Sequence, residues 1–359
     1  MISFTIHLFS EYDNYKASFS ENNMNLISFS KRLTILLLSL ALLCLSFTGC
    51  RKPDDGLTSI TLSEVAHSIF YAPQYAAIEL GYFKEEGIDL TLVNAGGADK
   101  VMTSLISGDA DIGFMGSEAS IYTYANGNED YAVNFAQLTQ RAGNFLVSRK
   151  PIENFSWAAL KGSTVLGGRA GGMPQMVFEY ILKKNGIDPK TDLEIDQSIS
   201  FGLTAAAFME NDADFTVEFE PHATALEQSG DGYVVASLGV DSGYVPYTAY
   251  CAKKSYFAEN SEMIQAFTNA IQKGLDYVNS HTAEEIATVI APQFAETDVK
   301  TIAIIVGRYL DQNTWKGDTI FTQESFDLLQ DILIDAGELK EKIPYEDLVT
   351  TEYARTAVE

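Results

Sequence analysis

The stretch that decides the fold is Ser68–Phe83, which reads Ser-Ile-Phe-Tyr-Ala-Pro-Gln-Tyr-Ala-Ala-Ile-Glu-Leu-Gly-Tyr-Phe. A strand-like run, Leu57–Val65, precedes it, and a second strand-like run, Ile88–Val93, follows it. Apolar residues recur at helical spacing within the stretch, and Gly81 lies where a helix would end. The pattern predicts the first loop and first helix of a βαβ unit. Because ligands of open parallel sheets sit beyond the carboxyl ends of the strands, we expect this loop to face a bound molecule.

Strand-like and helix-like patterns alternate along most of the remaining chain. The further expected strands are Asp111–Met115, Val133–Gln140, Asn144–Ser148, Thr164–Leu166, Leu193–Ile199, Asp214–Phe219, Tyr233–Leu238 and Val245–Lys253. The further expected helices are Ala98–Ser107, Gly116–Tyr124, Pro174–Lys184, Ala205–Glu210, Pro221–Gln228, Glu262–Ser280, Ala283–Ile290, Asp298–Leu310 and Gln323–Ala336. This alternation predicts an α/β fold with mainly parallel sheets.

Length, composition and charge limit the classes of protein to which the chain can belong. Its 359 residues, of which 46% are hydrophobic and 20% charged, suit one large or two modest packed domains. The formal net charge of −25 argues against a nucleic-acid partner, because nucleic-acid binding needs basic patches. The glycine-rich loop Gly167–Gly172 has neither the Lys-Ser/Thr of a phosphate-binding loop nor the spacing of a dinucleotide fingerprint. We therefore expect no cofactor.

The N-terminal part of the chain has the pattern of a secretory signal. Lys31 and Arg32 precede the apolar run Leu33–Phe47, and Thr-Gly-Cys follows at positions 48–50. A positive segment, an apolar segment and small residues before a cleavage site are together typical of a signal peptide.

Cys50 stands where a bacterial lipobox has its lipid-carrying cysteine, although Phe47 stands where that motif usually has Leu. The resemblance implies cleavage before Cys50 and attachment of lipid to its sulfur. We expect residues 1–23 to be an over-extended start, 24–49 a lipoprotein signal peptide and 50–56 a tether. The protein would then be held on the extracytoplasmic face of the cell membrane. A transmembrane anchor is the alternative, but the apolar run is short for a span of roughly 20 residues.

Cysteines and histidines give no indication of a metal site. Cys44 lies in the expected signal and Cys50 at the expected lipid site, so Cys251 is left without a disulfide partner. His67 and His222 are isolated and lack ligand spacing. We interpret both histidines as structural and expect no metal.

The stretch Ala76–Leu90 resembles the opening motif of a known family. It matches the pattern A-x-x-x-G-Y-F-x-x-E-G-(I/L)-(D/E)-(V/L) of the periplasmic-type solute-binding proteins of the nitrate, sulfonate, taurine and thiamine-precursor group, the NMT1/THI5-like ABC importer family. Ala95–Gly97, Gly108–Gly113 and Glu218–Pro221 fit the same family pattern. The resemblance covers nearly all of the chain after Cys50.

The resemblance implies an α/β clamshell of type II with two lobes, each a mainly parallel sheet flanked by helices. Residues 57–143 and 246–359 would form lobe I, and residues 144–245 lobe II. Such a protein closes on a small-molecule solute and delivers it to the permease and ATPase subunits of an ABC importer, without catalysis. Hinge motion is expected near Ala142–Asn144 and Ser242–Tyr247.

The residues leave the identity of the solute open. Thiamine-pyrimidine binders usually carry a Trp-x-Pro-Asn stretch and a His in the first loop; here the stretch is absent and Tyr71 stands where the His would be. A sulfonate, taurine or nitrate fits no worse, but no residue singles one out. The cysteine-rich iron motif of the related pyrimidine-forming enzymes is also absent, which disfavours an enzyme. A ligand-sensing lipoprotein without a permease is the remaining alternative.

Loops after the strands of the first lobe supply candidate ligand-binding residues. Gly116, Ser117 and Glu118 open a helix after a strand, so their amides and the Ser117 hydroxyl can hold an anionic oxygen with help from the helix dipole. An ordinary N-cap is the alternative interpretation. Gly97 belongs to the same set through the family pattern.

The second lobe and the crossover supply further candidates. Gly171, Gly172 and Met173 end the glycine-rich loop, where backbone can approach a ligand or simply make a tight turn. Arg141 stands where the chain leaves the first lobe. It can pair with an anionic solute, although a salt bridge between the lobes is the favoured alternative.

Two carboxylates and several aromatic residues complete the candidates. Glu218 and Glu220 share one face of a strand end, and a carboxylate facing the cleft would select a solute with a donor or a positive charge. Ser68, Phe70, Tyr71 and Tyr247 are candidates to wall the solute, with core packing as the alternative for each aromatic residue.

Overall fold

The stretch that opens the first βαβ unit folds as the sequence predicts. Strand β1 (Thr58–Glu64) leads through the 3-10 helix η1 (Ile69–Tyr71) into α2 (Ala72–Glu79). Gly81 has a φ of +79°, a conformation that glycine adopts without strain, and the helix ends just before it. A separate turn of helix, α3 (Tyr82–Glu85), then leads toward the second strand.

The structure is a computed structural model that describes residues 56–168, 170–199 and 202–359. Leu57–Glu359 forms one structural unit. The predictions for the start of the chain, the signal peptide and Cys50 lie outside the described residues. None of the described helices is both long enough and apolar enough to cross a membrane.

The first sheet has the strand order β2-β1-β3-β10-β4 within the described part of the chain. Its strands are β1, β2 (Ile88–Asn94), β3 (Ile112–Met115), β4 (Ala132–Thr139) and β10 (Thr248–Lys253). β1 pairs in parallel with β2 and β3, whereas β10 is antiparallel to β3 and β4. Because β10 comes from late in the chain, the sheet joins strands from 57–143 and 246–359.

The second sheet has the order β7-β6-β8-β5-β9, again counting only described residues. Its strands are β5 (Asn144–Ser148), β6 (Thr164–Leu166), β7 (Glu194–Asp196), β8 (Phe215–Phe219) and β9 (Tyr233–Ser237). β6 is parallel to β7 and β8, whereas β5 is antiparallel to β8 and β9. All five strands lie within residues 144–245.

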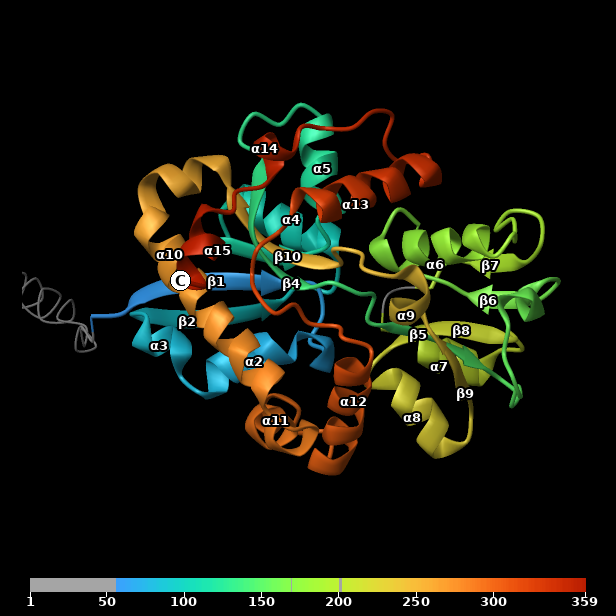
Figure 1. The fold of residues 1–359 in the computed structure, drawn as a ribbon. Coiled ribbons are helices and arrows are strands. Elements are labelled where there is room, and N and C mark those ends of the chain that lie inside the picture. The colour runs from blue at the N-terminus through green and yellow to red at the C-terminus, as the bar shows by residue number, and fades with distance from the viewer. Residues whose placement is uncertain (1–55, 169, 200–201) are drawn as a thin grey trace, which may run out of the picture. The chain divides into compact units, whose positions relative to one another are not determined.

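The expected α/β clamshell with two lobes is confirmed, since each sheet carries its own helices (Figure 1). Each sheet is mixed: the pairings make four of its five described strands run in one direction, and β10 or β5 runs opposite to them. We call the first sheet with its helices lobe I and the second sheet with its helices lobe II. The residue ranges 57–143 with 246–359, and 144–245, remain our proposal for the two lobes.

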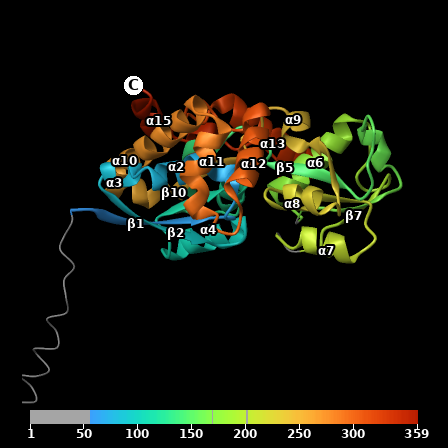
Figure 2. The same ribbon diagram turned by 90° about the horizontal axis from the view of Figure 1, so that it is seen from below.

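Helices cover both faces of the first sheet. The helices of lobe I, some of which pack on other helices, are α2, α3, α4 (Ala98–Ser107), α5 (Glu118–Ala125), α10 (Lys254–Ser280), α11 (Ala283–Ile290), η3 (Ala291–Gln293), α12 (Val299–Asp311), α13 (Gln323–Ala336), α14 (Tyr345–Leu348) and α15 (Glu352–Ala357). Figure 2 shows α2 and α10 on one side of β1 and β2 and α4 on the other. α10 begins before the predicted Glu262 and bends at Asn260, whose φ of −130° is not helical.

The helices of lobe II are shorter. They are η2 (Trp157–Leu160), α6 (Met173–Lys184), α7 (Thr204–Glu210), α8 (His222–Ser229) and α9 (Leu238–Ser242). The predicted strand at Leu193–Ile199 is cut to β7, because the Asp196 carboxylate accepts from the Ser198 backbone N–H at 2.8 Å and closes a turn there.

Late helices of lobe I also brace the crossovers into lobe II. On α12, the Tyr309 hydroxyl donates to the Gly143 carbonyl at 2.9 Å. Directly after α12, the Gln312 side-chain amide donates to the Ala142 carbonyl at 3.1 Å. These contacts fix the place where the chain passes from one lobe to the other.

Candidate functional site

A cavity lies between the two lobes, beyond the carboxyl ends of β1, β2, β3, β6 and β8. It has two adjoining compartments, which share Val65 and Gly96 of lobe I and Pro174 and Phe219 of lobe II. Strand ends and βα loops meet here, as is usual for ligand sites of open α/β sheets. The first loop, Ser68–Tyr71, contributes to both compartments as the sequence predicts.

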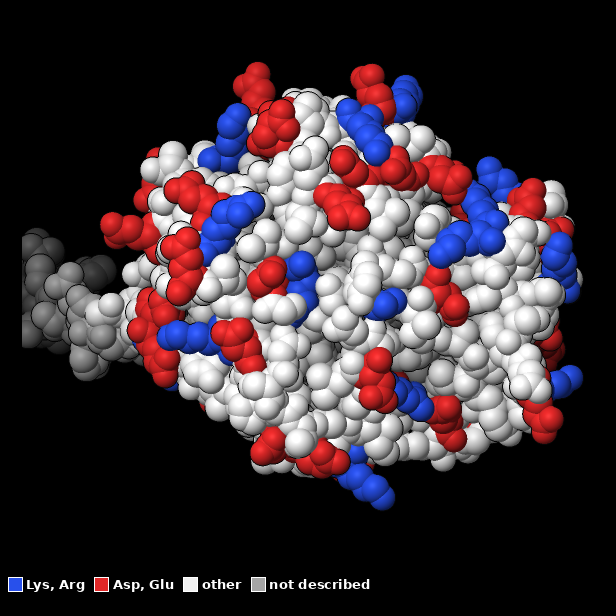
Figure 3. Space-filling view, in the orientation of Figure 1, with Lys and Arg blue, Asp and Glu red and all other residues white. Residues whose placement is uncertain are grey.

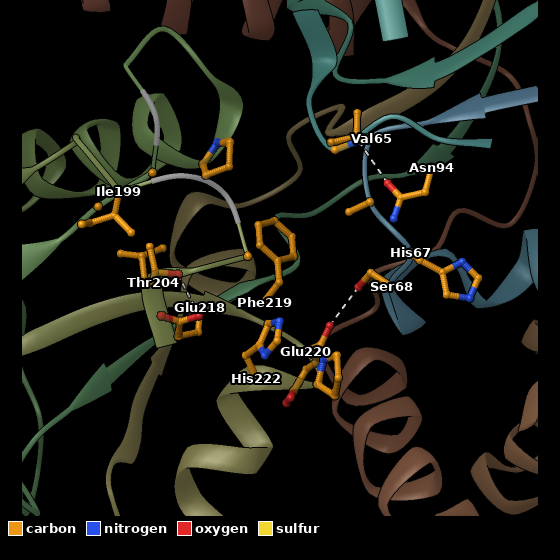
Figure 4. Close-up of a pocket in the computed structure, with 18 residues that line it drawn as sticks. Val65, His67, Ser68, Asn94, Ile199, Thr204, Glu218, Phe219, Glu220 and His222 are labelled. Carbon is orange, nitrogen blue, oxygen red and sulfur yellow. Dashed lines mark hydrogen bonds between the residues drawn. The ribbon is translucent and has the colours of Figure 1, made fainter. Parts of the chain in front are cut away.

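The first compartment, which we call the Glu218 compartment, has a volume of about 240 Å³. Ser68 and Asn94 line it from lobe I, and Thr204, Glu218 and His222 line it from lobe II. Figure 4 shows Glu218, Phe219 and His222 on one side of this space and Val65, Asn94 and Ser68 on the other.

The second compartment, which we call the Tyr71 compartment, has a volume of about 450 Å³. It gathers seven of the residues that the sequence singles out: Tyr71, Gly97, Gly116, Glu118, Gly172, Met173 and Tyr247. Thus loops far apart in the sequence meet around one space.

Ser68 connects the two lobes at the edge of the cavity. Its hydroxyl donates to the Glu220 backbone carbonyl at 3.0 Å and accepts from the Phe70 N–H at 3.3 Å. The hydrogen bond to Glu220 joins lobe I to lobe II, and the hydrogen bond from Phe70 caps the N-terminus of η1. The Ser68 hydroxyl is therefore already engaged within the protein.

The aromatic candidates divide between cavity and core. The Tyr71 ring packs edge-on against Phe114 with ring centroids 4.5 Å apart, and burial, followed by the charge of nearby carboxylates, raises the pKa of Tyr71. The Tyr247 hydroxyl lies 3.5 Å from the Asn144 side-chain oxygen. Phe70 lines neither compartment; it is fully buried and packs against surrounding aromatic rings. For Phe70 the structure favours the core-packing alternative.

The Gly116–Glu118 turn brings a carboxylate, rather than a hydroxyl, to the cavity. The Glu118 carboxylate folds back against Gly116, where a side-chain Cβ would lie 2.7 Å from the Glu118 Cδ. Ser117 is at the N-cap of α5, but its hydroxyl does not cap the helix. That hydroxyl is buried, has no hydrogen-bond partner among the described residues and lines neither compartment.

The glycine-rich loop of lobe II reaches lobe I through Gly171. The Tyr122 hydroxyl of α5 donates to the Gly171 carbonyl at 3.2 Å, and the Gly171 N–H donates to the Gln175 side-chain oxygen at 2.8 Å. Gly171 lines a separate hollow that shares Ala98 and Glu118 with the Tyr71 compartment, whereas Gly172 and Met173 line the Tyr71 compartment itself.

Glu218 and Glu220 both line the Glu218 compartment, but their carboxylates have different partners. Glu218 accepts from Thr204 Oγ1 at 3.0 Å and from Thr216 Oγ1 at 2.6 Å, and burial raises its pKa to about 7. The Glu220 carboxylate accepts from Arg308 Nη1 at 2.8 Å. Lobe I therefore holds Glu220 in two ways: Arg308 of α12 binds its carboxylate, and Ser68 binds its backbone carbonyl.

Arg141 is not brought to the cavity. Its guanidinium lies 4.2 Å from the centroid of the Tyr244 ring, and Nη1 donates to the Gly239 carbonyl at 2.8 Å. It lines neither compartment. The salt bridge between the lobes that the sequence favoured for Arg141 is also absent from the ion pairs of the described residues.

His67 is a functional candidate that the sequence reasoning assigned to structure alone. Its Nδ1 lies 2.9 Å from the Glu64 carboxylate and its Nε2 lies 2.8 Å from the Gln293 carbonyl. Both neighbours are acceptors, so the doubly protonated ring fits best. Accordingly, the hydrogen bond to Glu64 raises the pKa of His67. The sequence signal that could have placed His67 at the cavity is its position in the loop just after the first strand.

Comparison with known proteins identifies relatives over most of the chain. The family model described as NMT1/THI5 like matches residues 69–285. YtlA of Bacillus subtilis (strain 168), whose name proposes that it is a binding protein, is 45% identical over 303 residues, covering 84% of this chain and 91% of YtlA. The 4-amino-5-hydroxymethyl-2-methylpyrimidine phosphate synthase of Candida albicans (strain WO-1) is 22% identical over 237 residues, covering 60% of this chain and 65% of the synthase.

A solved structure has the same fold. The alkanesulfonate-binding protein SsuA from Xanthomonas axonopodis pv. citri, bound to MOPS, is similar with a TM-score of 0.66 and 14% sequence identity, covering 82% of this chain and 98% of SsuA. The likeness to SsuA concerns the fold alone. The family-model match and the 45% identity with YtlA together show that this chain belongs to the NMT1/THI5-like family.

Proposed function

We propose that this protein is the solute-binding component of an ABC importer, without catalysis of its own. The observation that carries the proposal is the cavity between the lobes, whose walls come from the carboxyl ends of strands in both sheets. The solute would be a small organic or anionic nutrient, of the sulfonate, taurine or nitrate kind or of the thiamine-pyrimidine kind. The fold shared with alkanesulfonate-binding SsuA supports this class of function.

Capture would proceed by closure of the two lobes on the solute. The hinge would lie at the crossovers near Ala142–Asn144 and Ser242–Tyr247, and the bound solute would shift the population toward the closed form. Residues of both lobes line the same cavity, so a solute there contacts both. The closed form would then deliver the solute to permease and ATPase subunits.

We further propose that Cys50 anchors the protein to the outer face of the cell membrane through lipid. The Thr-Gly-Cys sequence at positions 48–50, after the apolar run, supports the anchor. Labelling of expressing cells with a fatty-acid analogue should mark the wild type and leave Cys50→Ser unmarked. Equal labelling of both proteins would contradict the anchor.

A nucleic-acid partner is not part of the proposal. The net charge is −25, and on the face in Figure 3 the described acidic and basic side chains are interspersed. A surface of this kind offers no continuous basic track to a phosphate backbone.

The test is a thermal-shift screen of the purified full-length protein. The panel holds alkanesulfonates, taurine, nitrate, thiamine, its pyrimidine precursors and riboflavin. A true solute at a hundredfold excess over its dissociation constant should stabilise the fold by about 2.7 kcal/mol. Uptake of that solute by cells should require both this protein and a permease. Stabilisation without dependence of uptake on a permease would favour a sensor instead.

The second candidate is an enzyme of pyrimidine synthesis. It is favoured by the matches to the synthases of Candida albicans and of Aspergillus parasiticus, which are 22% and 24% identical to this chain. Against it, the sequence lacks the cysteine-rich motif, and its Cys251 is buried, with burial raising the pKa of the thiol to about 12. Turnover on supplying iron would overturn the binding-protein proposal.

A further inference from the structure

Glu218 is a buried carboxylate in the wall of the cavity. Only 1% of the residue is exposed, and each of its two oxygens accepts one hydroxyl hydrogen bond, from Thr204 and from Thr216. Because both oxygens accept, the arrangement suits the ionised form, which has acceptors only. A carboxylate has about four acceptor positions, so positions remain for further donors.

The other charged groups of the Glu218 compartment are paired within the protein. Glu220 is paired with Arg308 at 2.8 Å, and His67 with Glu64 at 2.9 Å. None of the ion pairs within the described part of the chain includes Glu218. Glu218 is therefore the carboxylate of this compartment whose charge no described cation balances.

His222 adds no positive charge at neutral pH. It lines the compartment, and burial lowers the pKa of its ring. The described charges around the Glu218 compartment thus favour a positive occupant over a negative one.

We propose that Glu218 determines the specificity of the site and selects a solute with a cationic nitrogen group, an ammonium or amidinium, that occupies the Glu218 compartment. The inference rests on the proposed solute-binding function. Burying a carboxylate costs free energy unless a counter-charge and hydrogen-bond donors compensate, and a cationic nitrogen supplies both. An anion in the same place would meet a like charge.

The two compartments suit the two ends of such a molecule. About 240 Å³ accommodates a compact cationic head, and the adjoining 450 Å³ can receive the rest of the solute. Tyr71, Tyr247 and Met173 line the larger space and offer apolar and aromatic surface. Phe219 lines both compartments and so belongs to the wall that they share.

The test compares four probes of similar shape and different charge. Benzamidinium and phenethylammonium are cations, benzamide is neutral and benzoate is an anion. Dissociation constants are measured by calorimetry with the full-length wild type, Glu218→Gln and Glu218→Asp. Glu210→Gln, which removes an exposed carboxylate at the end of α7, is the matched control.

A cationic probe should bind the wild type and Glu210→Gln equally, and should bind Glu218→Gln on the order of tenfold more weakly or worse, because a charged hydrogen bond is lost. Benzamide should bind no more weakly to Glu218→Gln than to the wild type. Glu218→Asp keeps the charge and should keep the preference for cations. The melting temperature of each unliganded variant establishes that it is folded.

A preference for benzoate, equal cation affinity in Glu218→Gln, or no binding of either cation would overturn the inference. The two proposals fail separately. If an anionic or neutral member of the nutrient panel binds and compacts the protein, the cation inference fails and the solute-binding function stands. If no probe and no nutrient stabilises the wild type, both fail.

Discussion

The Glu218 carboxyl makes the stability of the unliganded protein depend on pH. Burial raises its pKa from 4.5 to about 7. A carboxyl whose pKa is higher in the folded than in the unfolded state lowers stability as pH rises through that window. Between pH 4.5 and about pH 7, we expect the unfolding free energy of the wild type to fall by up to about 3 kcal/mol relative to that of Glu218→Gln.

Urea unfolding at about pH 4.5 and about pH 8 measures this effect. The free energy of unfolding of Glu218→Gln should increase relative to that of the wild type as pH rises, because the amide does not ionise. Glu210→Gln, which removes an exposed carboxylate, should follow the wild-type pH dependence. A constant difference between Glu218→Gln and the wild type would contradict the burial argument.

Arg308 should contribute far more to stability than an exposed cation with two acidic partners. It pairs with Glu220, whose side chain is fully buried, and with Glu227. Arg308→Gln leaves the Glu220 charge buried without its partner, so we expect a loss of about 2–4 kcal/mol in unfolding free energy.

Lys273 provides the control for Arg308, since it also contacts two carboxylates, Glu85 and Glu86, but has 40% of its side chain exposed. Lys273→Gln should cost less than about 1 kcal/mol. Chemical denaturation of both variants makes the comparison. Equal losses would show that burial of Glu220 has no special effect.

The positions of residues in short βα loops were easier to predict than the directions of long side chains near the crossovers. Gly97, Gly116 and Met173 lie beside strand ends, and local pattern alone places them in βα loops. Arg141 reaches past the crossover to α9, and Phe70 is covered by rings that include Tyr309 of α12. Those neighbours are distant in sequence. The local sequence around Arg141 or Phe70 therefore does not indicate where either side chain points.

Helices and strands followed the sequence pattern wherever local signals agreed with packing. The helix predicted at Ala98–Ser107 has those bounds, since Gly97 and Gly108 flank it. α2 differs from a half-exposed helix because its first six residues are all buried, an effect of α10 lying across it. No local pattern around α2 announces a helix almost 200 residues later.

The contact between α10 and α2 depends on Gly274. A Cβ at this position would clash with the Pro73 carbonyl and lie 3.1 Å from the Ala77 Cβ. Gly274→Ala should therefore destabilise the fold by about 1–3 kcal/mol, because the helices must separate.

Gly307 of α12 is the matched control for Gly274. An added Cβ there would have its nearest neighbour, the Ala283 Cβ, at 3.9 Å. Gly307→Ala should be neutral or stabilising by up to about 1 kcal/mol, because alanine favours the helix. Thermal or urea unfolding measures the stability of both variants. If Gly274→Ala were as stable as Gly307→Ala, the close contact between α10 and α2 at Gly274 would be refuted.

The molecule as a whole joins two lobes through contacts that surround the cavity. Ser68 reaches Glu220 on one side, and Tyr122 reaches Gly171 on another. The Lys183–Asp335 pair, with a separation of 2.8 Å, connects α6 to α13. These three contacts are two single hydrogen bonds and one partly exposed ion pair, which contribute little each; the stronger Arg308–Glu220 pair also joins the lobes. Rearrangement of the three weaker contacts is within the reach of the binding energy of a small solute.

Small-angle X-ray scattering of the full-length protein tests the central claim most directly. The protein is measured alone and with the solute that raises its melting temperature most. Closure on a solute in the cavity predicts a smaller radius of gyration with the solute present. A stabilising solute that leaves the radius of gyration unchanged would contradict closure of the two lobes on a ligand between them.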